Sequence, residues 1–116
     1  QRVLAAYLNA HLESTERVLL VAANSPGEYQ TSQALARELL SSNRLYAAAA
    51  RRAGRAQLAA FLRQIEPVLL ELARGDEPGA VGARIRDEDL PFKARAAAAM
   101  ARRGTPATPD PELRPL

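Results

Sequence analysis

The sequence predicts an all-α fold, a small bundle of four to six helices followed by a Pro-rich C-terminal tail. Residues 57–72 are the most informative, because large apolar side chains recur there every three or four positions: Leu58, Phe61, Leu62, Ile65, Val68, Leu69 and Leu72. This spacing gives one apolar helix face, and at roughly 1.5–3 kcal/mol per buried side chain the face requires partner helices. The 116 residues, 47% of them hydrophobic, are enough for one domain with its own core.

The N-terminal half predicts a helical hairpin. Leu and Val repeat at helical spacing over about residues 2–22, and the turn-forming residues 24–27 end that pattern. Thr31 and Ser32 are candidate N-caps, so a second helix is expected to begin near Thr31.

The second predicted helix has an apolar stripe formed by Leu35, Leu39, Leu40, Leu45, Tyr46 and Ala49. Polar residues 41–43 interrupt the stripe, because such side chains compete for backbone hydrogen bonds. We expect either one kinked helix or two helices joined at Asn43, ending at Gly54.

The C-terminal half predicts three further segments. The apolar face of residues 57–72 belongs to a helix that begins near Ala56, contains a kink at Pro67 and stops at Gly75. A short piece, residues 80–86, separates an Asp-Glu-Pro-Gly stretch from the acidic residues 87–89. The last helix should run over about residues 89–103, with acids before it and arginines at its end.

Residues 105–116 contain four prolines and predict an extended or mobile tail. The predicted domain is therefore residues 1–104.

The residue types present give little support to catalytic or metal chemistry. The chain has no Cys and one His, His11, so neither a disulfide framework nor a closed transition-metal site is expected. Its serines lie in cap or loop contexts, and the acidic residues 87–89 lack the spacing of a Ca²⁺ loop. We predict no enzyme activity, no catalytic or metal-binding residues and no cofactor.

The net charge of +3 is unevenly distributed: residues 43–75 and 90–104 each carry +4, and residues 76–89 carry −3. Fifteen of the sixteen cations are Arg, which in an Ala-rich chain points first to the base composition of the coding DNA. The only aromatic residue near Arg44, Arg51, Arg52 and Arg55 that could stack on a base is Tyr46, so we do not expect nucleic-acid binding.

No apolar stretch approaches the ~20 residues of a membrane-crossing helix. The chain begins at Gln1 within a helical pattern, and we expect it to be part of a longer polypeptide whose targeting or membrane segments lie upstream.

Five short stretches carry a family resemblance: residues 42–46 (SNRLY), residues 53–54 (AG), Leu58, residues 66–73 (EPVLLELA) and residues 90–95 (LPFKAR). With these, residues 1–103 resemble the C-terminal helical region of bacterial membrane-anchored zinc-finger anti-sigma-factor-like proteins. In that family a cytoplasmic zinc-finger module binds a sigma factor, a membrane helix follows, and the C-terminal part faces the periplasm as a sensor. The zinc-ligand motif and the membrane helix are absent here, so the resemblance implies a periplasmic sensor role without sigma-factor binding.

The favoured functional hypothesis is a non-enzymatic sensor or protein-interaction domain of such a regulator. Its partner is expected to be another protein or a second copy of the chain. The predicted partner-binding residues are Asn43, Arg44, Tyr46, Arg51, Arg52, Phe92, Lys93 and Arg95. Two alternatives stay open: a free-standing metal-binding or chaperone-like protein of the cell envelope, and a nucleic-acid-associated bundle.

Overall fold

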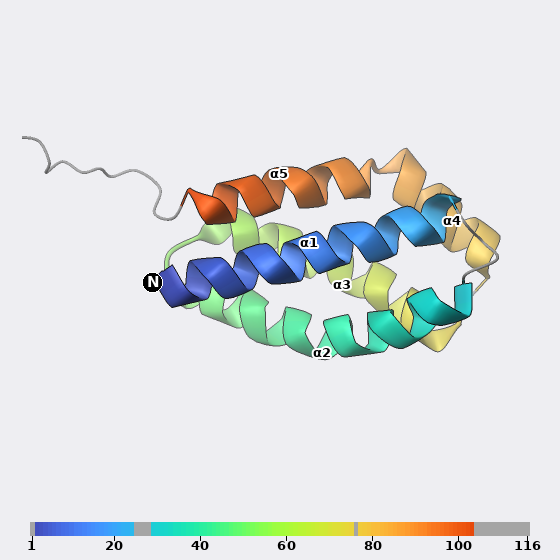
Figure 1. The fold of residues 1–116 in the computed structure, drawn as a ribbon, viewed down its shortest axis with the longest axis horizontal. Helices are drawn as coiled ribbons and strands as arrows, with labels where there is room; N and C mark the ends of the chain where they lie inside the picture. The colour runs from blue at the N-terminus through green and yellow to red at the C-terminus, as the bar shows by residue number, and fades with distance from the viewer. Residues whose placement is uncertain (1, 25–28, 76, 104–116) are drawn as a thin grey trace, which may run out of the picture.

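The computed structural model describes residues 2–24, 29–75 and 77–103, which form an all-α bundle without strands (Figure 1). These described residues contain five helices: α1 (Arg2–Asn24), α2 (Tyr29–Arg52), α3 (Ala56–Arg74), α4 (Pro78–Asp87) and α5 (Leu90–Arg102). This confirms the predicted fold class. The predicted Pro-rich tail, residues 105–116, lies outside the described residues.

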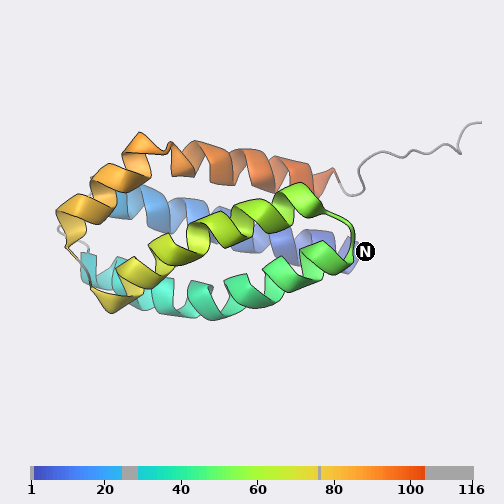
Figure 2. The ribbon, with the colours of Figure 1, turned by 180° about the vertical axis from the view of Figure 1, so that it is seen from behind.

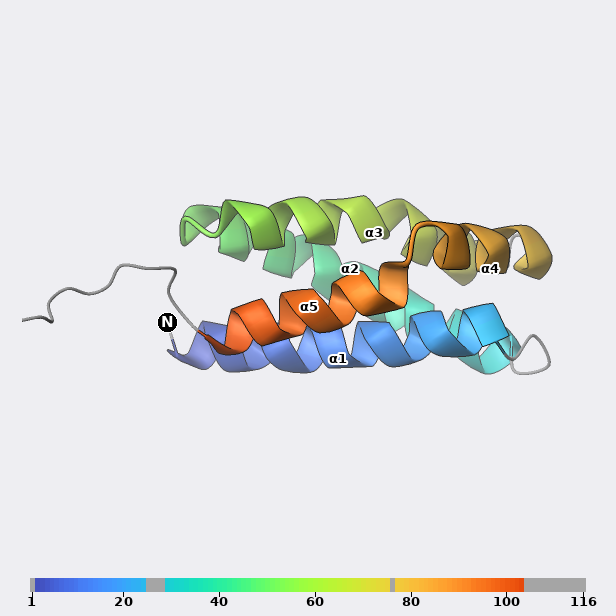
Figure 3. The same ribbon diagram turned by 90° about the horizontal axis from the view of Figure 1, so that it is seen from above.

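The four longer helices form two closely packed pairs. α2 packs most extensively on α3, and α1 packs most extensively on α5. Figure 3 shows α1 and α5 side by side, with α3 and the short α4 along the opposite edge. Figure 2 shows the bundle from behind, with α3 in front. α1 also packs on α2 and on α4, so the two pairs close into one bundle.

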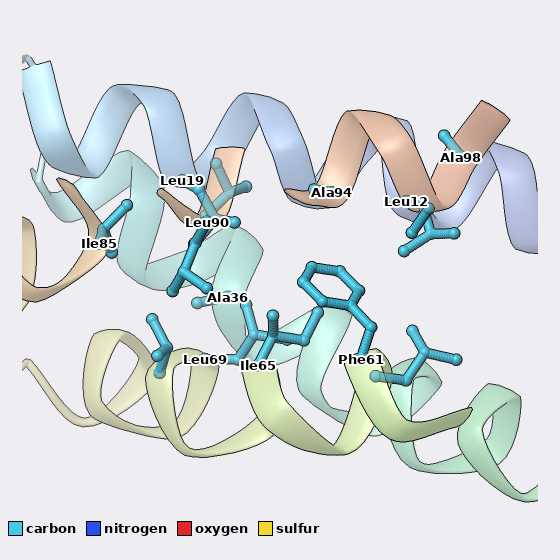
Figure 4. Packing of buried hydrophobic residues seen from close by; sticks show 14 of the residues in the cluster. Leu12, Leu19, Ala36, Phe61, Ile65, Leu69, Ile85, Leu90, Ala94 and Ala98 are labelled. Atoms are coloured by element: carbon cyan, nitrogen blue, oxygen red, sulfur yellow. The ribbon is translucent and has the colours of Figure 1, made fainter. Parts of the chain in front are cut away.

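The core lies between the two pairs and takes residues from all five helices. The α3 face predicted from residues 57–72 is its centre, since Leu62, Ile65, Val68 and Leu69 are fully buried. Figure 4 shows the ring of Phe61 pointing from α3 toward α5, which presents the small side chain of Ala94 there. The predicted central role of α3 is confirmed.

Helix ends follow local backbone chemistry. Gly75 closes α3 with a φ of 76°, a left-handed conformation that suits Gly, and its N–H reaches carbonyl groups of the last turn. Asp89, just before α5, has a φ of 55°. Short polar residues tolerate this conformation better than most. Pro78 and Pro91 lie in first turns, where a missing N–H breaks no helical bond.

α2 shows where the sequence pattern misled. It is one continuous helix through Asn43, so the alternative of two helices joined there is wrong. Its buried residues are small or polar, namely Ser32, Ala36, Asn43, Ala47 and Ala50. Leu35 and Leu45, expected in the apolar stripe, are instead 44% and 72% exposed. Small side chains on α2 let it lie close to the large side chains of α3. Leu39 and Leu40 are partly buried against this core, whereas Leu35 and Leu45 do not contribute to it.

Candidate functional site

Asn43 is a core residue, and its assignment to a partner-binding surface is wrong. It is fully buried. Its Nδ2 donates to the Leu62 carbonyl oxygen at 2.7 Å, and its Oδ1 lies 3.0 Å from His11 Nε2. The amide therefore joins α1, α2 and α3. These tertiary bonds explain why a residue that tends to interrupt helices does not interrupt α2.

His11, on the α1 side of this link, is 5% exposed. Because Asn43 uses its NH₂ group on Leu62, its oxygen must accept, and His11 must carry its proton on Nε2. Burial lowers the pKa of His11 below its usual 6.5, since desolvation disfavours the imidazolium, while the bond to Asn43 opposes the shift. Among the described residues, no group of three or more His, Cys, Asp or Glu could hold a metal ion.

Tyr46 lies half-buried next to this link, with its ring centroid 5.0 Å from that of His11 and the two rings tilted by 49°. Tyr46 therefore has a packing role in the core, which leaves only part of its side chain for a partner.

The predicted arginines lie on the outer surface of the α2–α3 pair. Arg44 Nε donates to Glu66 Oε2 at 2.8 Å, which ties the two helices together. Arg51 and Arg52 are exposed in the last turn of α2. Arg44 and Arg51 line a shallow cleft of about 200 Å³, and Arg63 of α3 joins them there. We call this the arginine cleft; its remaining lining residues are Ala47, Ala48 and Glu66.

Phe92, Lys93 and Arg95 are exposed on α5, with Phe92 59% exposed. Arg95 pairs with Glu16 of α1 at 2.9 Å. α5 packs on α1, α3 and α4 but only weakly or not at all on α2, and Figure 1 shows α2 and α5 on opposite sides of α1. The structure therefore does not join these three residues to the arginines of α2 in one surface.

Sequence reasoning missed two features. Arg63 was not singled out, because its place in the cleft follows from the register of α3 against α2. A cavity of about 330 Å³ between α1 and α2 was also missed. Its apolar walls come from Val18 and Val21 on one helix and Leu35 and Leu39 on the other. No motif signals such a cavity, since it depends on how the two helices pack.

Comparisons with family models, curated proteins and solved structures find no significant match to this chain. In the described part of the chain, none of the helices combines the length and the hydropathy that crossing a membrane requires.

Proposed function

We propose that this bundle is a non-enzymatic protein-interaction domain that binds an acidic segment of a partner protein in the arginine cleft. The observation that carries the proposal is the clustering of Arg44, Arg51 and Arg63 around small alanines. Guanidinium groups bind carboxylates through paired hydrogen bonds, and the alanines leave room for an incoming chain.

The charges in the cleft are only partly neutralised. Glu66 is its one acidic lining residue, and it already pairs with Arg44. Among the described residues, neither Arg51 nor Arg63 has a carboxylate within ion-pair distance. Leu45, 72% exposed, adds an apolar contact one helical turn from Ala48.

The proposal extends to the setting of the domain. We infer a sensor domain of a transmembrane regulator of anti-sigma type, on the periplasmic side, in keeping with the family resemblance of residues 1–103. Reading the full-length gene tests this setting. An upstream zinc finger and membrane helix support it. A cleavable signal sequence would favour a free-standing cell-envelope protein. The absence of all these upstream segments would favour a nucleic-acid-associated bundle.

Binding to the cleft can be tested with a labelled helical peptide rich in Glu and Leu, and with the same peptide in which Gln replaces Glu. Fluorescence anisotropy should show binding of the acidic peptide only, weakening as salt is added. Arg51→Glu with Arg63→Glu should weaken binding by about tenfold or more.

The matched control is Arg37→Glu with Arg103→Glu, which changes net charge equally at exposed positions outside the cleft. It should bind nearly as well as the parent. Equal losses in both double variants would show that net charge, and not the cleft, drives binding. Tighter binding of single-stranded DNA than of the peptide would favour the nucleic-acid alternative.

A further inference from the structure

The cavity between α1 and α2 has apolar walls and the size of a small ligand. Val18 is 3% exposed, Leu39 is half-buried, and Leu35 stands at the opening with 44% exposure. A cavity of about 150 Å³ accepts a benzene ring, so about 330 Å³ has room for roughly a dozen non-hydrogen atoms. An apolar molecule of that size would contact side chains from both helices.

One buried polar atom belongs to this cavity. Ser32 lines it and is 1% exposed, and its Oγ has no hydrogen-bond partner. Thr15, equally buried on α1, donates its hydroxyl to the His11 carbonyl oxygen at 2.9 Å. Buried hydroxyl groups almost always have such a partner. A ligand with one hydrogen-bonding group would supply the bond that Ser32 lacks.

The rim of the cavity carries one positive and one negative side chain. Arg17 on α1 and Glu38 on α2 both line it, both are exposed, and they make no ion pair with each other. Arg17 instead donates to Ser14 Oγ at 3.1 Å. An anion or a cation would meet one attractive and one repulsive charge at this rim, so the cavity offers no net preference for an ionic ligand.

We propose that the cavity between α1 and α2 binds a small uncharged amphiphile, with an apolar ring or chain against the valines and leucines and one hydroxyl against Ser32. This site lies on a different part of α2 from the arginine cleft and does not depend on the function proposed for that cleft. In a sensor domain, such a ligand would be the signal.

The probes are 4-propylphenol, propylbenzene, which lacks the hydroxyl, and 4-propylbenzoate, which carries a charge. Binding is followed by the methyl NMR signals of Val18 and Leu39 during titration. We expect saturable shifts with 4-propylphenol, affinity lower by about fivefold or more for propylbenzene, and the weakest binding for the benzoate.

Ser32→Ala should remove the preference for the phenol over propylbenzene while leaving the unliganded melting temperature unchanged or raised, because the substitution deletes an unpartnered buried hydroxyl. Ser41→Ala, at an exposed position of the same helix, is the matched control and should keep the preference. Val21→Phe should fill the cavity and weaken binding of both uncharged probes.

Three results would overturn the proposal: no saturable binding of 4-propylphenol, a phenol preference that survives Ser32→Ala, or tighter binding of the benzoate. The double variant Arg51→Glu with Arg63→Glu should leave phenol binding unchanged. Failure at the cavity is thereby separated from failure at the arginine cleft.

Discussion

The α2–α3 pair comes from the middle of the chain and the α1–α5 pair from its two ends, yet both pack in the same way. In the first, α3 supplies large side chains such as Leu62 and Ile65, and α2 supplies Ala36, Ala47 and Ala50. In the second, α1 supplies Leu8, Leu12 and Leu19, and α5 supplies Ala94, Ala97, Ala98 and Ala101. In each pair one helix thus buries large side chains and the other buries small ones, which lets the two backbones approach closely.

Both pairs have ion pairs at the surface, Arg44 with Glu66 in the first and Arg95 with Glu16 in the second, but their buried polar contacts differ. α2 and α3 share a fully buried amide, Asn43, whose hydrogen bonds also reach α1. α1 and α5 are joined at the surface by Arg95 with Glu16 and by Arg102 with Glu13. Breaking a buried hydrogen bond is costly because the polar group left behind has neither a protein partner nor a water molecule to bond to. Exposed ion pairs contribute little to stability. We therefore expect substitutions to lower stability most in the core, less at the buried amide and least at the surface ion pairs.

The largest effect is expected at the centre of the α2–α3 pair. Leu62→Ala should lower the free energy of unfolding by about 2–5 kcal/mol, because it removes buried apolar surface and leaves a cavity. Urea denaturation followed by circular dichroism measures it. Leu45→Ala, at an exposed position of α2, is the control and should change stability little. Equal effects of the two substitutions would contradict the assignment of the core.

A somewhat smaller effect is expected at the buried amide. Asn43→Leu should cost about 1–3 kcal/mol, because His11 Nε2–H loses its acceptor inside the core. Adding His11→Phe should recover part of that loss, since no orphaned donor remains. A double-mutant cycle gives the coupling directly. Strictly additive losses would show that the His11–Asn43 bond contributes nothing beyond packing.

The same link predicts a dependence of stability on pH. The pKa of His11 is lower in the folded state than its unfolded value of 6.5, so the unfolded chain binds the proton more readily. Stability is therefore fully present above pH 6.5. It falls as the pH drops below that value, by at most about 1.4 kcal/mol per pH unit. Urea midpoints between pH 7.5 and 5.5 should show this fall in the parent and lose most of it in His11→Phe.

The smallest effect is expected at the surface of the α1–α5 pair. Arg95→Gln should cost no more than about 1 kcal/mol, because Arg95 is 67% exposed and its attraction to Glu16 is screened by water and salt. A thermal melt at low and high salt measures the contribution. A loss as large as that of Asn43→Leu would remove the proposed difference between the two pairs.

Particular residues show how far the sequence could be read. The α3 face was predicted fully, because its large side chains repeat at helical spacing and have no competing interpretation. The buried face of α2 differs from the one that its sequence predicts. Its leucines indicate a helix but do not show which face is buried. Asn43 looks like a surface residue in the sequence, because a polar side chain that interrupts an apolar stripe usually faces water. Its two partners, His11 and Leu62, lie far away in the chain.

The sequence by itself determined the helical class, the approximate extents of the described helices and the central place of α3, because these depend on local propensity, caps and periodicity within one segment. Only the tertiary structure decided that α1 pairs with α5, that Arg63 joins Arg44 and Arg51 in one cleft, and that Ser32 lines a cavity. These features arise from the register between helices distant in sequence, which the pattern along a single helix does not encode.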